Sequence, residues 1–255
     1  MWFKVAAFVI APFWLLPAAR ADNAIIAVAT NFLDTATDIE ARFEADGTHM
    51  IDIVAGATGK LYAQIKAGAP YDAFLSADQT APQKLVDENL AVTGGAFTYA
   101  IGKLALYSAN PNLFTDQNAE QFLLEGSYRY LAIANPELAP YGAAANIYLQ
   151  NLIATKSMSQ SVLKDRIVTG QNIGQAFTLV QSGAAEIGLV AYAQVLKTGT
   201  GGSFWLVAPS AYPPIKQDAV LLTRSADNAA AIAFLTFLKT DVALAIIKSH
   251  GYDRP

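Results

Sequence analysis

Short apolar runs along this chain alternate with segments whose apolar residues recur every three or four positions. The run Ile25–Ala29 is rich in β-branched residues, and the segment Phe32–Phe43 that follows it has helical periodicity. A β-branched run of this length is typical of a buried strand, whereas a period near 3.6 predicts an amphipathic helix. The first predicted unit is therefore a strand followed by a helix.

The same unit recurs through the chain. We predict strands at residues 25–29, 50–54, 73–76, 130–134, 166–168 and 187–191, extended segments at 97–107, 204–207 and 219–223, and helices at 32–43, 61–67, 81–88, 142–152, 173–182, 226–238 and 242–248. Successive strand–helix units predict mostly parallel sheets flanked by helices. The restart of the pattern after residues 97–107 favours two α/β lobes, residues 22–100 with 216–255 and residues 101–215. A single continuous sheet is the alternative.

The first 21 residues differ from the rest. Lys4 precedes the apolar run Val5–Leu16, and the segment ends in Ala19–Ala21. A basic start, an apolar middle and a small-x-small end are typical of a cleavable secretory signal, and the apolar run is short for a membrane span. We therefore expect residues 1–21 to be a signal peptide of a secreted protein. A membrane anchor that stays attached is the alternative.

The charge balance and the numbers of cysteine and histidine residues exclude several classes of function. Without the first 21 residues the chain has 15 basic and 21 acidic residues, a net charge of about −6, which argues against nucleic acid or an anionic membrane as a partner. The chain has no cysteine, so disulfides, thiolate nucleophiles and cysteine metal sites are excluded, and its histidines are His49 and His250 alone. We expect no metal site and no cofactor.

Small and polar residues follow the predicted strands of the first half. Thr30 and Asn31 come directly after the first strand, and Asp34 lies three residues past Asn31, a spacing that resembles a capping box. Gly56–Gly59 follows the second strand; its small residues permit close backbone approach, and Thr58 supplies a hydroxyl at a second helix start. Ligands of open α/β sheets bind beyond the carboxyl ends of the strands, so both starts should face the cleft.

The second half repeats this arrangement. Pro140–Ala143 opens one predicted helix, and Gly170–Gly174 opens another. Each segment by itself has a simpler interpretation as a helix cap or a turn, as do Thr30 and Asn31. Four helix starts at strand ends, two in each lobe, nevertheless aim unpaired backbone N–H groups at a common point. The residues alone therefore predict a binder of an anion or of a small polar ligand.

The type of donor limits the ligand. A backbone N–H group can only donate a hydrogen bond, whereas a protonated oxyanion such as hydrogen phosphate also needs an acceptor. A lining without Asp or Glu offers few acceptors, so it favours a fully deprotonated tetrahedral dianion. Asp34, in the first helix turn, is able to cap backbone groups rather than face the ligand. Asp72 and Asp78 flank a predicted strand, and we interpret them as structural caps rather than as a catalytic pair.

Six segments carry a resemblance to a known family. They are residues 28–33, 56–65, 68–78, 97–104, 135–142 and 182–191, and Gly68–Asp78 (Gly-Ala-Pro-Tyr-Asp-Ala-Phe-Leu-Ser-Ala-Asp) is the most specific of them. In order and over essentially the whole mature chain, they closely resemble the periplasmic molybdate-binding proteins of bacterial ABC transporters. The resemblance implies a type II periplasmic-binding-protein fold with the ligand in the interlobe cleft. It also implies that a periplasmic monomer binds molybdate or tungstate and delivers it to the permease subunits of an ABC importer.

The resemblance further implies which residues bind the oxyanion. Carried over position by position, these are Thr30, Asn31, Thr58, Tyr141 and the backbone N–H of Ile173. No free metal cation is implied, because molybdenum or tungsten enters only as the oxyanion. Two positions depart from the family pattern. Thr58 stands where serine is common, and Ala191 stands where some members have a ligating tyrosine, with Tyr192 one residue later. Tyr141 is the candidate for the missing donor.

Two alternatives stay open at this point. A receptor of the same fold for sulfate, phosphate or another anion is one, because cavity size is not readable from a sequence. A secreted hydrolase such as a phosphatase is the other. The chain has no Gly-x-Ser-x-Gly elbow, no cysteine nucleophile and no His-Glu-x-x-His motif. We therefore expect a transport receptor that closes on its ligand and does no covalent chemistry.

Overall fold

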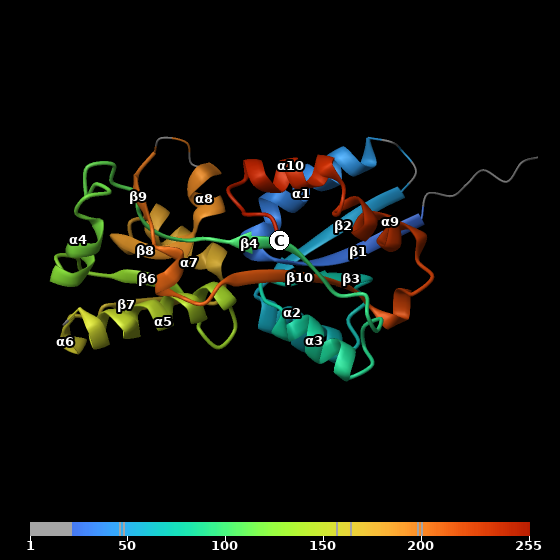
Figure 1. Cartoon of the computed structure of the whole chain (residues 1–255), viewed down its shortest axis with the longest axis horizontal. Coiled ribbons are helices and arrows are strands. Elements are labelled where there is room, and N and C mark those ends of the chain that lie inside the picture. Colours follow the sequence, from blue (N-terminus) through green and yellow to red (C-terminus); the bar gives the residue numbers. More distant parts are fainter. Residues whose placement is uncertain are drawn as a thin grey trace, which may run out of the picture.

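The computed structural model describes residues 22–255 apart from residues 46, 48, 157, 164, 198 and 200. The predicted signal peptide, residues 1–21, lies outside the described residues. The described chain forms two α/β lobes, each built on one open five-stranded sheet with helices on both faces (Figure 1). This arrangement confirms the predicted two-lobed α/β fold.

Lobe I is built on strands β2 (His49–Gly56), β1 (Asp22–Ala29), β3 (Ala73–Leu75), β10 (Ile215–Leu221) and β4 (Phe97–Gly102), in that spatial order. β1 pairs in parallel with β2 and β3, whereas β10 pairs antiparallel with β3 and β4. The helices of this lobe are η1 (Thr30–Phe32), α1 (Leu33–Glu44), α2 (Thr58–Lys66), α3 (Thr80–Asp87), η3 (Thr223–Ser225), α9 (Ala229–Phe237) and α10 (Asp241–Ser249).

Lobe II is built on strands β7 (Ile167–Gly170), β6 (Leu131–Ala134), β8 (Ile187–Ala191), β5 (Leu104–Ser108) and β9 (Ser203–Leu206), in that spatial order. β6 pairs in parallel with β7 and β8, and β5 pairs antiparallel with β8 and β9. Its helices are α4 (Ala119–Glu125), α5 (Pro140–Thr155), α6 (Gln160–Leu163), α7 (Ile173–Gln181) and α8 (Tyr192–Lys197), and η2 (Pro209–Ala211) lies on the return to lobe I.

Both sheets are more mixed than the predicted mostly parallel arrangement, because two of the four strand pairs in each sheet are antiparallel. The antiparallel strands are those next to the crossings between lobes. β4 and β5 are separated by Lys103 alone, and β9 returns through η2 to β10. Parallel neighbours need a covering crossover connection. β5 follows β4 after one residue and β10 follows the three-residue helix η2, so neither strand is preceded by such a connection. The predicted lobe boundaries themselves stay a prediction.

The sequence of β1 explains why the lobe I sheet is covered on both faces. Ile26 and Val28 pack into one core with Phe234 of α9, whereas Ala27 packs into a second core with Leu61 of α2. Successive strand residues point to opposite faces, so an uninterrupted apolar strand needs helices on both sides. In Figure 1, α1, α9 and α10 lie on one side of the sheet and α2 and α3 on the other. Full burial of an Ile, Val, Leu or Phe side chain contributes about 1.5 to 3 kcal/mol.

The C-terminal segment lies against the first crossing between the lobes. Ile101 and Asp253 exchange two backbone hydrogen bonds, each 3.0 Å long. The carboxylate of Asp253 also pairs with Lys103 Nζ at 2.6 Å. The end of the chain, marked C in Figure 1, therefore sits beside β4 where that strand passes between the lobes.

Three short helices, α4, α6 and α8, do not appear among the predicted elements. They have four to seven residues each, which is at most two turns, so the apolar period that predicts a helix is not visible in them. α8 also begins at Tyr192, directly after the last residue of β8. A strand that passes into a helix without an intervening polar segment gives no boundary signal in the sequence.

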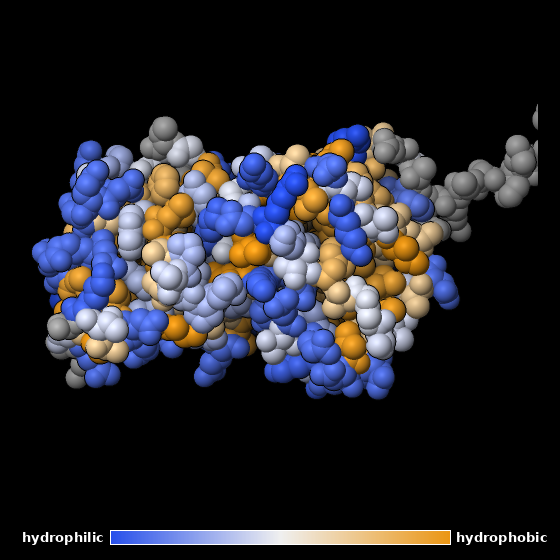
Figure 2. All heavy atoms as spheres, viewed as in Figure 1, coloured by the Kyte–Doolittle hydropathy of each residue, from blue (hydrophilic) through white to orange (hydrophobic). Residues whose placement is uncertain are grey.

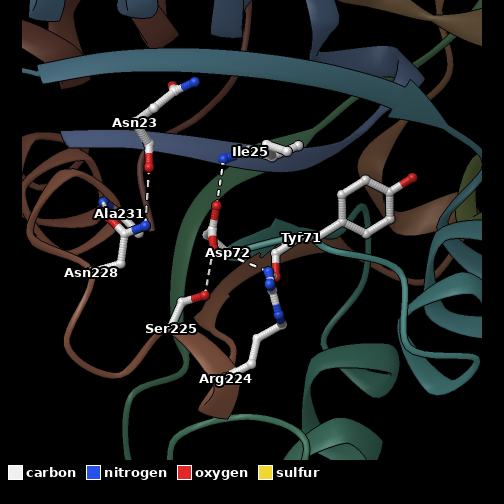
Figure 3. Close-up of polar contacts among 8 residues, drawn as sticks. All are labelled: Asn23, Ile25, Tyr71, Asp72, Arg224, Ser225, Asn228 and Ala231. Atoms are coloured by element: carbon white, nitrogen blue, oxygen red, sulfur yellow. Dashed lines mark hydrogen bonds and ion pairs between the residues drawn. The ribbon is translucent and has the colours of Figure 1, made fainter. Parts of the chain in front are cut away.

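Asp72 connects three segments of lobe I through its carboxylate (Figure 3). Its carboxylate, 8% exposed, accepts hydrogen bonds from Ile25 N–H at 2.6 Å, from the Ser225 hydroxyl and from Arg224 at 3.2 Å. Asp78 lies at the opposite end of β3 and accepts from Ala81 N–H at 2.8 Å, which caps α3. The predicted structural role of both carboxylates is confirmed, although Asp72 holds a strand rather than a helix start.

Two features bear on membrane association: the side of the molecule viewed in Figure 2 and the apolar length of the described helices. On the side viewed in Figure 2, hydrophilic residues are spread over both lobes, and the apolar groups between them form small patches. Within the described part of the chain, no single helix is long and apolar enough to cross a membrane. α9 and α10 reach that length only together, as a pair bent by 65°. Ala230, Phe234 and Ile247 of this pair are fully buried in the lobe I core.

We predict that Asp72→Ala destabilises the protein by about 2 to 4 kcal/mol, because Ile25 N–H and the Ser225 hydroxyl lose a charged acceptor in a buried place. Urea unfolding of the purified protein measures the change. The matched control is Asp87→Ala, whose exposed carboxylate accepts one hydrogen bond from Gln83; it should stay within about 0.5 kcal/mol of wild type. Equal stabilities for the two variants would contradict the anchoring role of Asp72.

Candidate anion-binding site

A small cavity lies between the two lobes and is lined by residues from both. The lining is Ala29, Thr30, Asn31, Gly56, Ala57, Thr58, Ala77, Ala139, Pro140, Tyr141, Asn172 and Ile173. The five residues predicted as ligands, Thr30, Asn31, Thr58, Tyr141 and Ile173, are all in this set, so the structure brings them together. The cavity volume is about 10 Å³, which is about the space that one water molecule needs.

Two helices of lobe I begin at this cavity. η1 starts at Thr30 directly after β1, and α2 starts at Thr58 two residues after the end of β2. β1 and β2 are parallel neighbours whose last residues, Ala29 and Gly56, lie opposite each other. The carboxyl ends of the two strands therefore coincide, and both helices start at the same edge of the sheet.

Lobe II presents the same arrangement from the other side. α5 starts at Pro140 after β6, and α7 starts at Ile173 after β7. β6 and β7 are also parallel neighbours, with Ala134 opposite Gly170 at their ends. Two pairs of helix starts, one pair from each lobe, thus face one small cavity.

The N-cap residues of these helices are unusual. η1, α2 and α5 have Ala29, Ala57 and Ala139 at the N-cap, without a side-chain hydrogen bond. Alanine is a poor N-cap, and its cost relative to Ser, Thr, Asn or Asp is about 1 kcal/mol. By contrast, α9 and α10 are capped by Asn228 and Thr240. Three helices at the cavity therefore leave the N–H groups of their first turn without a side-chain acceptor. One of these groups, Gly59 N–H of α2, donates instead to the backbone oxygen of Leu138 at 2.9 Å.

The fourth helix, α7, is capped in a way that still leaves a donor at the cavity. Asn172 is its N-cap, and the side-chain oxygen of Asn172 accepts from Gln175 N–H at 2.9 Å. The N–H of Ile173 belongs to the first position of the helix and is not the group that Asn172 caps. Ile173 is 3% exposed, so its N–H group is nearly shielded from solvent.

Two threonine hydroxyls complete the donor set. Thr30 Oγ1 is shielded from solvent and has no hydrogen-bond partner among the described residues. Thr58 Oγ1 accepts from Ala77 N–H at 3.1 Å, and this bond uses a lone pair of the oxygen. Because a hydroxyl has one donor and two acceptor positions, the hydrogen of Thr58 stays available to a ligand in the cavity.

The electrostatics of the site come from the backbone. The twelve lining residues include no Asp, Glu, Lys, Arg or His. Each helix N-terminus carries the equivalent of roughly half a positive charge, and four of them surround the cavity. The arrangement is therefore attractive to an anion although the chain as a whole is acidic. Because the lining offers donors rather than acceptors, a protonated anion is disfavoured.

The side-chain amide of Asn31 is used within the protein, in a buried hydrogen-bond network, and is not a donor to the cavity. Its Nδ2 donates to Gln217 Oε1 at 2.8 Å and to Tyr252 Oη at 3.2 Å, which uses both amide hydrogens. Tyr252 Oη in turn donates to the backbone oxygen of Asn31 at 2.7 Å. The network therefore fixes the start of η1, and the group that Asn31 has left for a ligand is its backbone N–H.

The same network reaches the other lobe through Gln217, which is fully buried on β10. Gln217 Nε2 donates to Tyr141 Oη at 3.5 Å, and Gln217 Oε1 also accepts from Tyr99 Oη at 3.2 Å. Desolvation by burial raises the pKa of Tyr99 and of Tyr141 well above 10, and it also raises the pKa of Tyr252. These hydroxyls are therefore neutral, and the hydrogen of Tyr141 Oη is available to donate.

The structure decides two points about Asp34 and Tyr192 that the sequence raised. The capping box formed by Asn31 and Asp34 is wrong, because Ala29 is the N-cap of η1 and Asp34 instead forms an ion pair with Lys197 of α8, in the facing lobe. Tyr192 is not in the cavity lining. Its ring packs on Phe204, with ring centroids 5.7 Å apart, so it stays outside the donor set.

Known proteins that are similar to this chain also bind solutes. The sequence profile of the family described as bacterial extracellular solute-binding protein matches residues 24–253. The chain belongs to this family. A solute-binding protein works by holding its ligand rather than by transforming it, and a cleft between two lobes that is lined by hydrogen-bond donors serves that purpose.

Individual members of the family are similar over most of their length. The molybdate-binding protein ModA of Azotobacter vinelandii is 46% identical over 237 residues, which cover 92% of this chain and 91% of that protein. The ModA protein of Rhodobacter capsulatus is also 46% identical, with 93% and 90% covered. The solved periplasmic molybdate-binding protein of Azotobacter vinelandii superposes with a TM-score of 0.83 at 40% identity, covering 91% of this chain and 99% of that one.

A more distant structure shows what the fold alone leaves undecided. The sulfate-binding protein SubI of Mycobacterium tuberculosis superposes with a TM-score of 0.72 at 12% identity, covering 91% of this chain and 87% of that one. At this identity the likeness concerns the fold only. Of these two proteins with the same fold, one is described as molybdate-binding and the other as sulfate-binding. The fold therefore does not determine the ligand, and the choice depends on the residues at the cavity.

The residues that sequence reasoning missed are the alanines. Ala29, Ala57 and Ala139 stand at N-cap positions where a side-chain acceptor is normally preferred. Their signal is present in the sequence, since each directly precedes a helix start and lies between a strand and the helix that follows it. Gln217 has no such signal, because its partner Asn31 is 186 positions away along the chain.

The buried tyrosines predict a loss of stability in alkali. Unfolded tyrosine ionises near pH 10, whereas burial keeps Tyr99, Tyr141 and Tyr252 neutral to higher pH. The unfolded state then binds fewer protons than the folded state, so stability falls as pH rises above about 10, by about 1.4 kcal/mol per pH unit for each such tyrosine.

Urea unfolding at pH values from about 9 to 12 measures this slope, and Tyr252→Phe serves as the matched variant. Removal of one buried tyrosine should reduce the slope by about 1.4 kcal/mol per pH unit. An unchanged slope in Tyr252→Phe would show that this hydroxyl ionises in the folded protein as readily as in the unfolded one.

Proposed function

We propose that this protein captures molybdate or tungstate outside the cytoplasmic membrane and delivers it to the permease subunits of an ABC importer. The observation that carries the proposal is the convergence of four helix N-termini, three of them with alanine N-caps, on a cavity without charged side chains. The identity of 46% to two molybdate-binding proteins supports the choice of ligand.

In this proposal each predicted residue has a role as a donor. Thr30 contributes its hydroxyl and Asn31 its backbone N–H, while Thr58 contributes its hydroxyl and the N–H at the start of α2. From the facing lobe, Tyr141 and Ile173 contribute the donors at the starts of α5 and α7. Each helix end stabilises an anion by 0.3 to 1 kcal/mol, and by up to about 2 kcal/mol in a partly buried place.

The donor set favours a particular protonation state. Molybdate and tungstate bind as fully deprotonated dianions, which accept hydrogen bonds at every oxygen. Hydrogen phosphate carries a proton that needs an acceptor, and the lining residues offer no carboxylate for it. The cavity of about 10 Å³ has room for about one water molecule, so a compact tetrahedral ion needs far less opening of the lobes than an extended organic anion does. Sulfate, a compact dianion as well, is the competing ligand.

Binding is coupled to closure of the two lobes. The lobes, residues 22–100 with 216–255 and residues 101–215, rotate about the two crossings, and the anion stabilises the closed form because only that form surrounds it with donors from both sides. The closed monomer is then the form that the membrane subunits recognise. Residues 1–21 direct export to the periplasm, and no cofactor, metal cation or catalytic step takes part.

A thermal melt of the mature protein with equal concentrations of molybdate, tungstate, sulfate and phosphate tests the choice of ligand. At a hundredfold its dissociation constant, a ligand that binds only the folded state adds about 2.7 kcal/mol of stability. We expect molybdate and tungstate to raise the melting temperature and phosphate to leave it unchanged. A shift with sulfate or phosphate alone would overturn the assignment.

The variant Ala57→Asp tests the mechanism. An aspartate at this N-cap can accept hydrogen bonds from the first-turn N–H groups of α2 that Leu138 leaves open. It also places a negative charge at the cavity, so it competes with the anion for these donors. We expect molybdate affinity to fall by about a hundredfold or more, which is about 2.7 kcal/mol, since an attraction of up to about 2 kcal/mol at this helix end is lost and a repulsion between two anions is added.

The control for this variant is Thr240→Asp, which puts the same charge at the N-cap of α10, a helix that does not line the cavity. It should bind molybdate as the wild-type protein does. Titration calorimetry measures both affinities. Equal losses in the two variants would mean that net charge, rather than the free N–H groups at the cavity, governs binding.

A further inference from the structure

Two glycines hold the lobes in contact on either side of the cavity. Gly59 is the second residue of α2 in lobe I, and its N–H donates to the backbone oxygen of Leu138 in lobe II at 2.9 Å. Gly174 is the second residue of α7 in lobe II, and it faces Thr30 in lobe I. Each glycine directly follows a residue of the proposed donor set, Thr58 in one case and Ile173 in the other.

The space at these glycines is too small for a side chain. A Cβ atom on Gly174 would lie 2.6 Å from Thr30 Cγ2, and a Cβ atom on Gly59 would lie 3.3 Å from both Cα and O of Leu138. Carbon atoms that do not bond each other approach to about 3.5 to 4.0 Å. A methyl group at position 174 therefore overlaps the facing lobe by roughly 1 Å, and one at position 59 by a few tenths of an ångström.

The backbone itself does not require glycine at either position. Eight glycines of the described chain have positive φ angles, and neither Gly59 nor Gly174 is among them. Both have helical surroundings, where alanine is the better residue because it loses less conformational entropy. The main obstacle to a side chain at these two positions is therefore the opposite lobe. At Gly174 it is the Thr30 methyl group at 2.6 Å, with Asn172 Oδ1 of the same lobe a weaker obstacle at 3.2 Å.

We propose that Gly174, with a smaller contribution from Gly59, sets how closely the two lobes close and thereby allows donors from both to reach one compact anion. The proposal rests on the proposed function, because it concerns the same site. A methyl group at position 174 leaves two ways to relieve the overlap. Either the lobes stay about 1 Å further apart, or Thr30 rotates and takes its unpartnered Oγ1 out of the cavity wall. Both responses lengthen a donor–anion contact.

The test is a double-variant cycle for molybdate affinity, measured by calorimetry. Gly174→Ala should weaken binding by about tenfold or more, and Gly59→Ala should weaken it less, in the order of the two overlaps. Thr30→Ser removes Cγ2 and keeps a hydroxyl, so the nearest atom of the facing lobe is then Thr30 Cβ, at 3.8 Å. The remaining close neighbour, Asn172 Oδ1 at 3.2 Å, belongs to lobe II itself and is the same in both backgrounds. Thr30→Ser alone serves as the reference for the double variant. Gly174→Ala should reduce the affinity of the Thr30→Ser protein much less than it reduces the affinity of the wild-type protein.

A melt without ligand separates this role from damage to the fold. Because alanine favours helices, Gly174→Ala should keep or raise the melting temperature of the free protein while its affinity falls. The proposal is overturned if Gly174→Ala binds molybdate like the wild-type protein, or if it loses the same factor with serine and with threonine at position 30.

Failure of the proposed function has a different signature. If the wild-type protein binds none of the four oxyanions, the ligand assignment is wrong, and the glycine proposal is tested through lobe closure alone. The chain has no cysteine, so spin labels can be attached to cysteines introduced at the exposed positions Asp87 of lobe I and Gln150 of lobe II. Gly174→Ala should then shift the distance distribution between the labels outward, and Thr30→Ser should reverse the shift. An unchanged distribution would refute the proposal.

Discussion

Unpaired backbone N–H groups at helix starts are the constraint on which this structure depends. A buried N–H group without a partner is costly, and most helices meet this need with a side-chain acceptor at the N-cap. Ala29, Ala57 and Ala139 provide none. Since adjacent parallel strands end side by side in each lobe, the affected helices begin at one edge of each sheet. When the two edges face each other, the chain holds donors that an external acceptor can satisfy.

A second layer of hydrogen bonds keeps these donors in place. Asn31 uses both hydrogens of its amide within the protein, on Gln217 and Tyr252. Gln217 lies on the strand that returns from lobe II and also contacts Tyr141 of the facing lobe. Both halves of the site are therefore connected through one buried amide near a crossing between the lobes. Because the groups are neutral, this layer supports an anion without adding a charge that would need its own partner.

Much of the fold follows from the sequence, because hydrophobic periodicity records burial. The apolar run of β1 predicts a strand covered on both faces, and the helical period of Phe32–Phe43 predicts the helix that follows. The antiparallel pairing near the crossings was not predictable in this way, since pairing direction depends on how the chain passes between lobes. α8 was missed because it continues from β8 without a polar boundary.

The candidate site also has a part that the sequence predicts and a part that it does not. The five predicted residues lie at strand ends, where the order of strands and helices determines their position, and the structure brings them to one cavity. Contacts between distant segments have no local pattern to reveal them. Asp34 looks like a cap in the sequence, but its partner is Lys197 in the other lobe. The close approach of Gly174 to Thr30 joins positions 144 residues apart, and only the packed lobes make it visible.

The central claim is that neutral donors hold a fully deprotonated dianion. Calorimetric titration of the mature protein with molybdate, repeated near neutral pH in buffers of different ionisation enthalpy, tests it most directly, because it counts the protons exchanged on binding. The account predicts no proton exchange and the same affinity in every buffer, since the described lining contains no acidic or basic residue. Uptake or release of about one proton for each bound anion would show that a titrating group takes part, and it would contradict the account.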